Sequence, residues 1–175
     1  MDFARVLGRV ADFFAREEYE YAVIGAFGLH AYGLTRATSD LDFATQAEAQ
    51  PKLLAFLVSE GYETINVSPG YSNHVHPDPA LGRVDFVYVA GATSRRLFEG
   101  CKRIALAGRM VPVPRPEHLA AMKVQAMKND PERTLQEMAD VRFLLGLPGV
   151  DEAEIRGYFE KSGLTERYED IKRLP

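Results

Sequence analysis

A proline-rich segment, Pro112-Val113-Pro114-Arg115-Pro116, divides the chain into two parts with different hydrophobic periodicity. Before it, short apolar runs of strand length alternate with amphipathic stretches of helix length, which indicates an α/β arrangement with a mixed sheet. After it the pattern is helical throughout. We therefore predict the fold class α/β (α+β), with a mixed β-sheet core flanked by helices over residues 1–113 and a C-terminal helical part over residues 114–175.

Glycines that follow apolar runs set several boundaries of the expected elements. Gly25 closes a buried strand, and Gly33 and Gly61 each end a helix. Strands are expected at residues 21–24, 40–44, 62–67, 72–76 and 84–89, with one or two more between 102 and 113. Helices are expected at residues 2–18, 26–32, 51–60, 94–98, 117–128, 131–146, 151–162 and 165–173.

Composition restricts the class of protein. The 175 residues are 46% hydrophobic and 26% charged, which is typical of a soluble globular protein. The single cysteine, Cys101, allows no internal disulfide, and no apolar run is long enough to span a bilayer. The N-terminal residues lack the pattern of a signal peptide. We expect a cytoplasmic protein without a membrane partner.

The distribution of charge points to an anionic ligand without identifying it. A net charge of −4 argues against a protein that coats nucleic acid. Residues 91–130, however, hold 8 basic and only 3 acidic side chains. This basic section could face a polyphosphate or an RNA backbone, or it could be an ordinary unevenness of surface charge.

Two carboxylates stand on one face of an expected strand. Asp40 and Asp42 flank Leu41, and side chains two residues apart in a strand point the same way. Carboxylates at this spacing can converge on one hard cation or bridge two. An Asp-x-Asp pair alone is weak evidence, because it also occurs in solvated turns.

A third acid strengthens the metal hypothesis. Asp85 lies in a strand that is apolar on both faces, where a charge is costly unless it is paired or bound to metal. Arg83, two residues away on the same face, offers a salt bridge as the competing explanation. If the three carboxylates converge, each pair about 4 Å apart repels by about 4 kcal/mol at an effective dielectric near 20. A hard divalent cation, Mg²⁺ or alternatively Mn²⁺, would offset that repulsion.

The segment before these acids could hold phosphate. Val23 and Ile24 form the end of a strand that enters a helix across Gly25 and Ala26. A helix N-terminus presents free N–H groups to phosphate oxygens, and glycine allows a close approach to the backbone.

These motifs together resemble the DNA polymerase β-type nucleotidyltransferase superfamily. The resemblance rests on Gly25-Ala26, then Arg36-x-Thr38-x-Asp40-Leu41-Asp42, then a later strand carrying Asp85. It implies that Asp40, Asp42 and Asp85 are catalytic and ligate two metal ions. It also implies a set of contacts to an NTP, ATP among the candidates: Gly25, Ala26, Arg36, Thr38 and Ser39. Ala26 stands where many members have serine.

The helical part resembles the abortive-infection toxin branch (AbiEii-like) of that superfamily. The resemblance rests on the segment from His118 to Lys123 and on the segment from Arg133 to Val141. It implies nucleotide contacts from Lys123, Arg133 and Asp140, a tRNA or protein hydroxyl as acceptor, and an antitoxin as a candidate partner. The residues themselves leave open that Lys123 is a surface lysine and that Arg133, Glu137 and Asp140 form an exposed ion-pair stripe. Leu135, Met138, Val141 and Leu145 are expected to form the opposing apolar stripe.

The predicted activity is transfer of a nucleoside monophosphate from an NTP to an acceptor hydroxyl, with release of pyrophosphate. One alternative is a catalytically silent domain that binds nucleotide or a partner protein, which Ala26 and Glu137 would favour. Another is phosphodiester hydrolysis by the same carboxylates. His74 and His76 are expected to be half-exposed residues of an edge strand, and Cys101 lacks an adjacent base that would make it a nucleophile.

Overall fold

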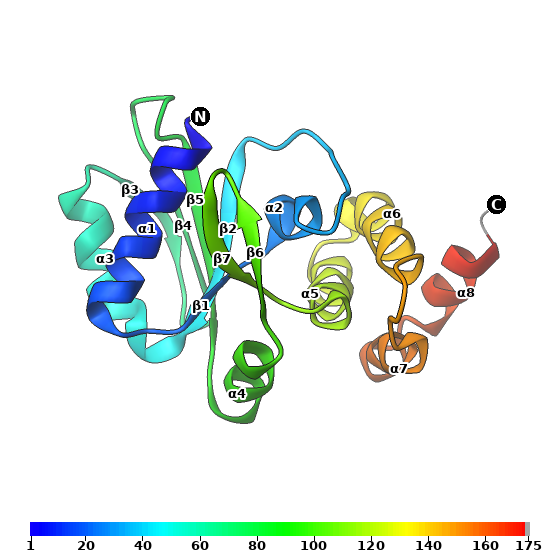
Figure 1. Cartoon of the computed structure of the whole chain (residues 1–175). Coiled ribbons are helices and arrows are strands. Elements are labelled where there is room, and N and C mark those ends of the chain that lie inside the picture. The colour runs from blue at the N-terminus through cyan, green and yellow to red at the C-terminus, as the bar shows by residue number, and fades with distance from the viewer. Residues whose placement is uncertain (174–175) are drawn as a thin grey trace. The chain divides into compact units, whose positions relative to one another are not determined.

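A computed structural model describes residues 1–173, which form two compact units, Met1–Pro114 and the segment that begins at Arg115. The first unit contains a five-stranded mixed sheet with the order β1-β2-β5-β4-β3 (Figure 1). The strands are β1 (Tyr21–Val23), β2 (Asp40–Gln46), β3 (Glu63–Val67), β4 (Tyr71–Val75) and β5 (Arg83–Val89). β2 and β5 are parallel, and the other neighbours are antiparallel. This mixed sheet with flanking helices confirms the predicted fold class.

Helices cover the sheet and a hairpin continues the first unit. The helices are α1 (Phe3–Glu17), α2 (Gly25–His30), α3 (Gln50–Ser59) and α4 (Gly91–Glu99), with a short 3-10 helix, η1 (Ala47–Ala49), before α3. The expected strands between 102 and 113 are two, β6 (Lys102–Leu106) and β7 (Arg109–Val113), paired as an antiparallel hairpin. β7 lies against β1.

An aromatic cluster joins α1 to the centre of the sheet. Phe14 of α1 is fully buried and stacks on Tyr21 of β1 at 4.8 Å between ring centroids. It also contacts Phe43 of β2 and Phe86 of β5, which stack on each other at 5.3 Å. Because Phe43 and Phe86 point to this side of the sheet, their neighbours Asp42 and Asp85 point to the other side.

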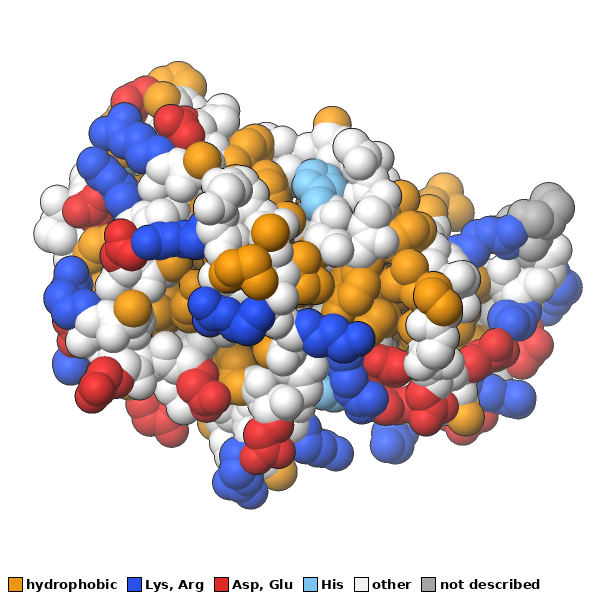
Figure 2. Space-filling model, viewed as in Figure 1, with side chains coloured by type: hydrophobic (Ala, Val, Ile, Leu, Met, Phe, Trp, Pro, Cys, Tyr) orange, Lys and Arg blue, Asp and Glu red, His pale blue; other side chains and the backbone are white. Residues whose placement is uncertain are grey.

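The outer surface of α1 carries charges of both signs. Figure 2 shows Lys and Arg side chains interspersed with Asp and Glu side chains over this helix. Arg9 pairs with Glu60, and Arg109 pairs with Asp12 at 2.6 Å. This face therefore presents no extended basic surface to a nucleic acid.

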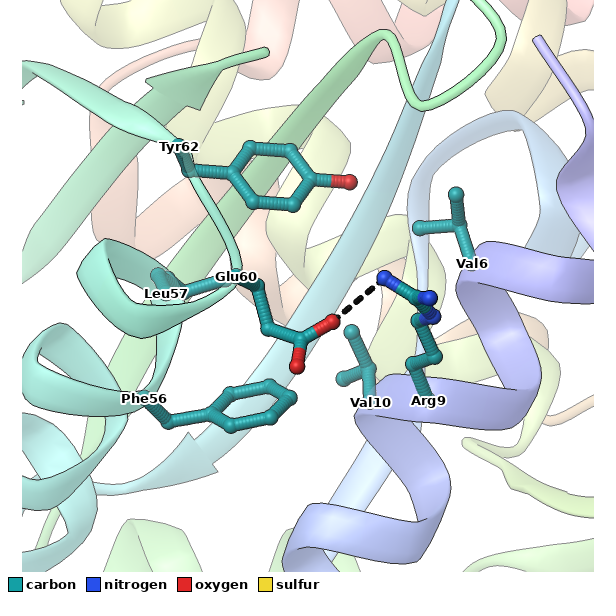
Figure 3. A pocket seen from close by; sticks show the side chains of 7 residues that line it. All are labelled: Val6, Arg9, Val10, Phe56, Leu57, Glu60 and Tyr62. Carbon is teal, nitrogen blue, oxygen red and sulfur yellow. Dashed lines mark hydrogen bonds and ion pairs between the residues drawn. The ribbon is translucent and has the colours of Figure 1, made fainter.

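A small hollow lies beneath the Arg9–Glu60 ion pair (Figure 3). Its lining residues come from α1, from α3 and its C-cap, and from the residue before β3: Val6, Arg9, Val10, Phe56, Leu57, Glu60 and Tyr62. Its volume is ≈ 10 Å³, about the space that one water molecule requires. It is too small to hold a substrate.

The second unit consists of helices. They are α5 (Pro116–Asn129), the 3-10 helix η2 (Pro131–Arg133), α6 (Thr134–Leu145), α7 (Glu152–Ser162) and α8 (Thr165–Arg173). Its core is apolar and includes Leu119, Val124, Leu144, Ile155 and Phe159. No helix within residues 1–173 combines the length and the hydropathy that a bilayer crossing would need.

The expected stripes of α6 are partly wrong. Met138 and Val141 are buried as predicted, but Leu135 is 83% exposed. Glu137 and Asp140, for which an exposed stripe was one of two interpretations left open, are buried. They are buried because α5 supplies a cation that pairs with both of them.

Candidate functional site

The register of two parallel strands brings the three predicted carboxylates together. Asp42 of β2 is directly opposite Asp85 of β5, and Asp40 is opposite Arg83. One carboxylate oxygen from each of Asp40, Asp42 and Asp85 lies within 4.8 Å of the others, and all three residues are partly buried. The convergence that the sequence predicts is therefore present in the structure.

The positive charge of Arg83 partly offsets the negative charge of the three carboxylates. Its Nε donates to both carboxylate oxygens of Asp85 at 3.0 Å, and a terminal guanidinium nitrogen lies 2.9 Å from one of them. The hydrogen bond to Asp85 raises the pKa of Arg83, and the charges of Asp40 and Asp42 act in the same direction. The salt bridge considered as an alternative thus exists beside the cluster of acids. One cation against three carboxylates still leaves a surplus of negative charge.

Gly25 has a steric role that the sequence did not reveal. Its φ is +59°, and a Cβ at this position would lie 1.9 Å from Oδ2 of Asp42. Only a residue without a side chain allows the start of α2 to pass so close to this carboxylate. The preceding Ile24 N–H donates to the carbonyl of Asp42 at 2.9 Å, which fixes the approach.

The connector between α2 and β2 contributes an orienting hydrogen bond. The Thr38 hydroxyl donates to Oδ1 of Asp40, so Thr38 positions a carboxylate, a role that was not predicted from the sequence. His30 of α2 holds the same connector, since its Nε2 lies 2.9 Å from the carbonyl oxygen of Arg36. The sequence gives no signal for this role of His30. Nucleotide contacts from Arg36, Thr38 and Ser39 stay a prediction.

The donor set fits a hard divalent cation. Its members are carboxylates only, without a thiolate or imidazole, and oxygen donors are what such cations prefer. None of the three carboxylates is fully buried, so a cation can reach them from solvent. The cluster can therefore accept cations that balance its charge.

The expectation for His74 is wrong. The side chain is fully buried, because β4 lies between β5 and β3 rather than at the edge of the sheet. Its Nε2 lies 2.8 Å from the Ser72 hydroxyl and its Nδ1 lies 3.1 Å from the Thr64 hydroxyl. Burial lowers the pKa of His74, so the neutral imidazole is favoured. Both ring nitrogens are thereby engaged with hydroxyl groups and not with a metal site.

The thiol of Cys101 is protonated at neutral pH. Burial raises its pKa to about 12, and its sulfur donates to the carbonyl of Leu97 at 3.3 Å. A thiol in this state is a poor nucleophile.

In the second unit, Lys123 lies in a buried ion network. Its ammonium nitrogen is 2.8 Å from Glu137 and 2.8 Å from Asp140, and Arg133 contacts Glu137 at 2.6 Å. Lys123 is not a surface lysine, since its side chain is 7% exposed. The anions that a buried ammonium requires are supplied by α6. Contacts of Lys123, Arg133 and Asp140 with a nucleotide stay a prediction.

Comparison with known families gives one match that covers half of the chain. The model of the family described as aminoglycoside-2''-adenylyltransferase matches residues 6–95. No curated protein matches the chain in sequence.

Several solved structures share the fold. The solution structure of the antibiotic-resistance factor ANT(2'')-Ia superposes with a TM-score of 0.71 at 13% identity, over 98% of this chain and 97% of that one. The lincosamide antibiotic adenylyltransferase LnuA, with lincomycin bound, gives 0.59 at 16% identity, over 81% of this chain and 96% of that one. A nucleotidyltransferase-like protein from Paracoccidioides brasiliensis gives 0.59 at 15% identity, over 98% and 90%. At these identities the likeness shows a common fold, and it gives no support to the abortive-infection toxin branch.

Proposed function

The chain belongs to the family described as aminoglycoside-2''-adenylyltransferase, a family of nucleotidyltransferases, and from this premise we propose that it transfers a nucleoside monophosphate from an NTP to a hydroxyl group of a small acceptor. The observation that carries the proposal is the convergence of Asp40, Asp42 and Asp85 within 4.8 Å. Since the family is described by adenylyl transfer, ATP is the proposed donor.

The three carboxylates are the proposed ligands of two Mg²⁺ ions, which Mn²⁺ could replace. Bound in this way, the ions would polarise the phosphate oxygens and neutralise the charge of the triphosphate. Asp40 and Asp42 are proposed to hold both ions, and the Thr38 hydroxyl to keep Asp40 in position. Gly25 would leave Asp42 free to face them, because no side chain competes for that space.

Asp85 is the proposed acceptor of the proton. The oxygen of the acceptor hydroxyl attacks the α-phosphorus while its proton passes to the Asp85 carboxylate. The bond between the α-phosphorus and the bridging oxygen breaks, and pyrophosphate leaves with the electron pair of that bond. Arg83 stays beside Asp85 and holds the orientation of its carboxylate.

The nucleotide contacts are proposed from both parts of the sequence. Five residues that precede Asp40 along the chain are proposed to contact the triphosphate: Gly25, Ala26, Arg36, Thr38 and Ser39. The proposed contacts from the helical unit are Lys123, Arg133 and Asp140. A tRNA or protein acceptor and an antitoxin partner are not needed to account for any feature of the site.

Calorimetric titration with Mg²⁺-ATP tests whether this site exists. We expect the wild type to bind Mg²⁺-ATP and the Asp42→Asn variant to lose that binding, because the variant lacks one of the carboxylates proposed to bind the cations. Glu48→Gln is the matched control, since Glu48 is an exposed acid in η1 outside the cluster. Equal binding by the wild type and Asp42→Asn would contradict the proposal.

Transfer of label from α-³²P ATP into a small-molecule fraction tests the reaction. Labelled acceptor together with pyrophosphate is the expected result. Free AMP without labelled acceptor would instead indicate phosphodiester hydrolysis, and binding without turnover would indicate a silent nucleotide-binding domain.

A further inference from the structure

The connector between α2 and β2, residues 31–39, carries three of the proposed triphosphate contacts and contains neither helix nor strand. Figure 1 shows it leaving α2 and arching over to the start of β2. Leu34, Arg36 and Thr38 are partly buried, whereas the residues between them are exposed. This alternation is that of an extended chain, whose inner side carries these three residues and faces the protein.

Hydrogen bonds hold this inner side at its middle and at its end. The carbonyl oxygen of Arg36 lies 2.9 Å from Nε2 of His30, the last residue of α2, and the Thr38 hydroxyl donates to Asp40. A fully extended chain of the connector's length would reach about 30 Å. The contact at Arg36 instead keeps the connector folded back on the helix from which it starts.

His30 acts as the donor in this contact. A carbonyl oxygen only accepts hydrogen bonds, so Nε2 carries the proton. The N–H of Arg36 is farther from the same nitrogen, at 3.4 Å. The ring of His30 packs against Phe27 at 5.0 Å between centroids, and Phe27 packs against Phe3 of α1 at 4.6 Å. The donor therefore belongs to a ring whose position is fixed by its neighbours.

The helix α2 joins this donor to the carboxylate cluster. It has six residues, so its length is about 9 Å. Its first residue lies against Asp42, since a Cβ on Gly25 would be 1.9 Å from Oδ2 of that carboxylate. Its last residue holds the Arg36 carbonyl. One short helix thus sets the position of the middle of the connector relative to Asp42.

We infer that His30 is a positioning residue for the nucleotide. By donating to the Arg36 carbonyl, it keeps the connector folded on α2, with Arg36 and Thr38 on its inner side. The inference rests on the proposed function and adds a residue that does not itself contact the nucleotide. Without this donor the connector is free until the nucleotide binds, and the entropy cost of ordering it then weakens binding.

Three replacements of His30 separate the donor from the ring. His30→Gln places an amide N–H near the position of Nε2, His30→Asn has an amide that does not reach the Arg36 carbonyl, and His30→Ala has no donor. We expect the Kd and the KM for Mg²⁺-ATP to rise about three- to tenfold in the Ala and Asn variants, and to stay within about twofold of the wild type in His30→Gln. The kcat should change by less than about twofold in all three, because the metal ligands are unchanged.

Tryptic cleavage of the nucleotide-free protein tests the connector directly. The bond after Arg36 is a trypsin site, and its cleavage follows the population of the open connector when opening is fast relative to cleavage. We expect cleavage there to be at least about threefold faster in His30→Ala and His30→Asn than in the wild type or His30→Gln. Cleavage after Arg96, which is exposed on α4, is the internal reference, since general destabilisation would accelerate cleavage at both sites.

His76→Ala is the matched control. His76 is also a partly buried histidine whose ring binds the backbone of a loop, since its Nδ1 accepts from the Asp78 N–H at 2.9 Å. This variant should retain the wild-type Kd for Mg²⁺-ATP and the wild-type rate of cleavage after Arg36.

The outcomes separate the inference from the proposed function. An unchanged Kd for Mg²⁺-ATP in His30→Ala, or an equal rise in His30→Gln, would overturn the inference and leave the proposed function standing. Faster cleavage after both Arg36 and Arg96 would also overturn it, because His30 would then support the fold as a whole. Absence of any Mg²⁺-ATP binding that depends on Asp42 would overturn the proposed function and the role of His30 with it.

Discussion

At the residue scale, the structure ties the carboxylate cluster to the absence of a side chain at position 25. In Gly25→Ala the new Cβ would overlap Oδ2 of Asp42, at 1.9 Å, in a backbone with φ +59°. We expect a loss of about 1–3 kcal/mol in the free energy of unfolding from the backbone alone. Displacement of Asp42 should also abolish stabilisation by Mg²⁺. Urea unfolding with and without Mg²⁺ measures both effects.

Gly91 provides the control for that variant. It is the first residue of α4, its φ is +58°, and nothing lies within 4 Å of an added Cβ. Gly91→Ala should therefore lower the free energy of unfolding through the strained backbone alone and should still be stabilised by Mg²⁺. If both alanine variants keep that response, Gly25 is not needed to place Asp42.

Arg83 supports a second prediction at the same scale. Arg83→Gln removes the cation that partly compensates the aspartates, so the metal-free protein should lose stability, by up to about 1 kcal/mol because the pair is partly screened by solvent. Added Mg²⁺ should then raise the melting temperature more than it does in the wild type. Arg9→Gln is the matched control, since Arg9 has a similar exposure and pairs with Glu60 away from the cluster. Equal Mg²⁺ shifts in both variants would refute the compensating role.

At the scale of elements, local patterns predicted what a strand or helix is but not what it packs against. Alternation around Leu41 placed Asp40 and Asp42 on one face correctly. The register that sets Asp42 opposite Asp85 joins strands far apart in the chain, so it could be expected only from the resemblance to a family. The structural role of Gly25 depends on the antiparallel pairing of β1 with β2, which brings Gly25 to Asp42, and was missed.

The burial of particular polar residues was the other feature that the sequence did not predict. His74 was placed on an edge strand because nothing local shows that β3 pairs outside β4. An exposed stripe with Glu137 and Asp140 was left open because helical periodicity alone does not show that Lys123 reaches them from α5. In each case a partner from another element decides the environment of the residue.

The buried imidazole of His74 predicts acid sensitivity of the sheet. Burial lowers its pKa below the ordinary 6.5, against a weaker opposing effect of Asp85. The folded state therefore binds the proton less readily than the unfolded chain, and this contribution to stability, full above pH 6.5, is lost as the pH falls through the lowered pKa. Urea midpoints should drop between pH 7.5 and pH 5 by less in His74→Gln than in the wild type. His76→Gln, at a partly exposed histidine just after β4, should retain the wild-type drop. If the urea midpoint of His74→Gln drops as much as that of the wild type, groups other than His74 cause the acid sensitivity.

At the scale of the whole molecule, the charge distribution bears on the size of the acceptor. The net charge is −4, and the surface over α1 mixes both signs (Figure 2). A macromolecular acceptor such as tRNA would be bound through phosphate contacts, and 6–10 of these would make affinity fall by about 10³–10⁵ between 50 and 200 mM salt. A small acceptor of low charge releases few counterions and should not show this dependence.

We therefore expect kcat/KM for a small neutral acceptor to change by less than about threefold between 50 and 200 mM KCl, at saturating ATP and constant free Mg²⁺. The KM for ATP, measured in parallel, accounts for the screening of the triphosphate itself. A neutral acceptor makes no ion pairs, so the stronger screening of charge at high salt should leave its contacts unchanged. A steep decrease of kcat/KM with salt, together with label transferred from α-³²P ATP into RNA, would show that the acceptor is a nucleic acid.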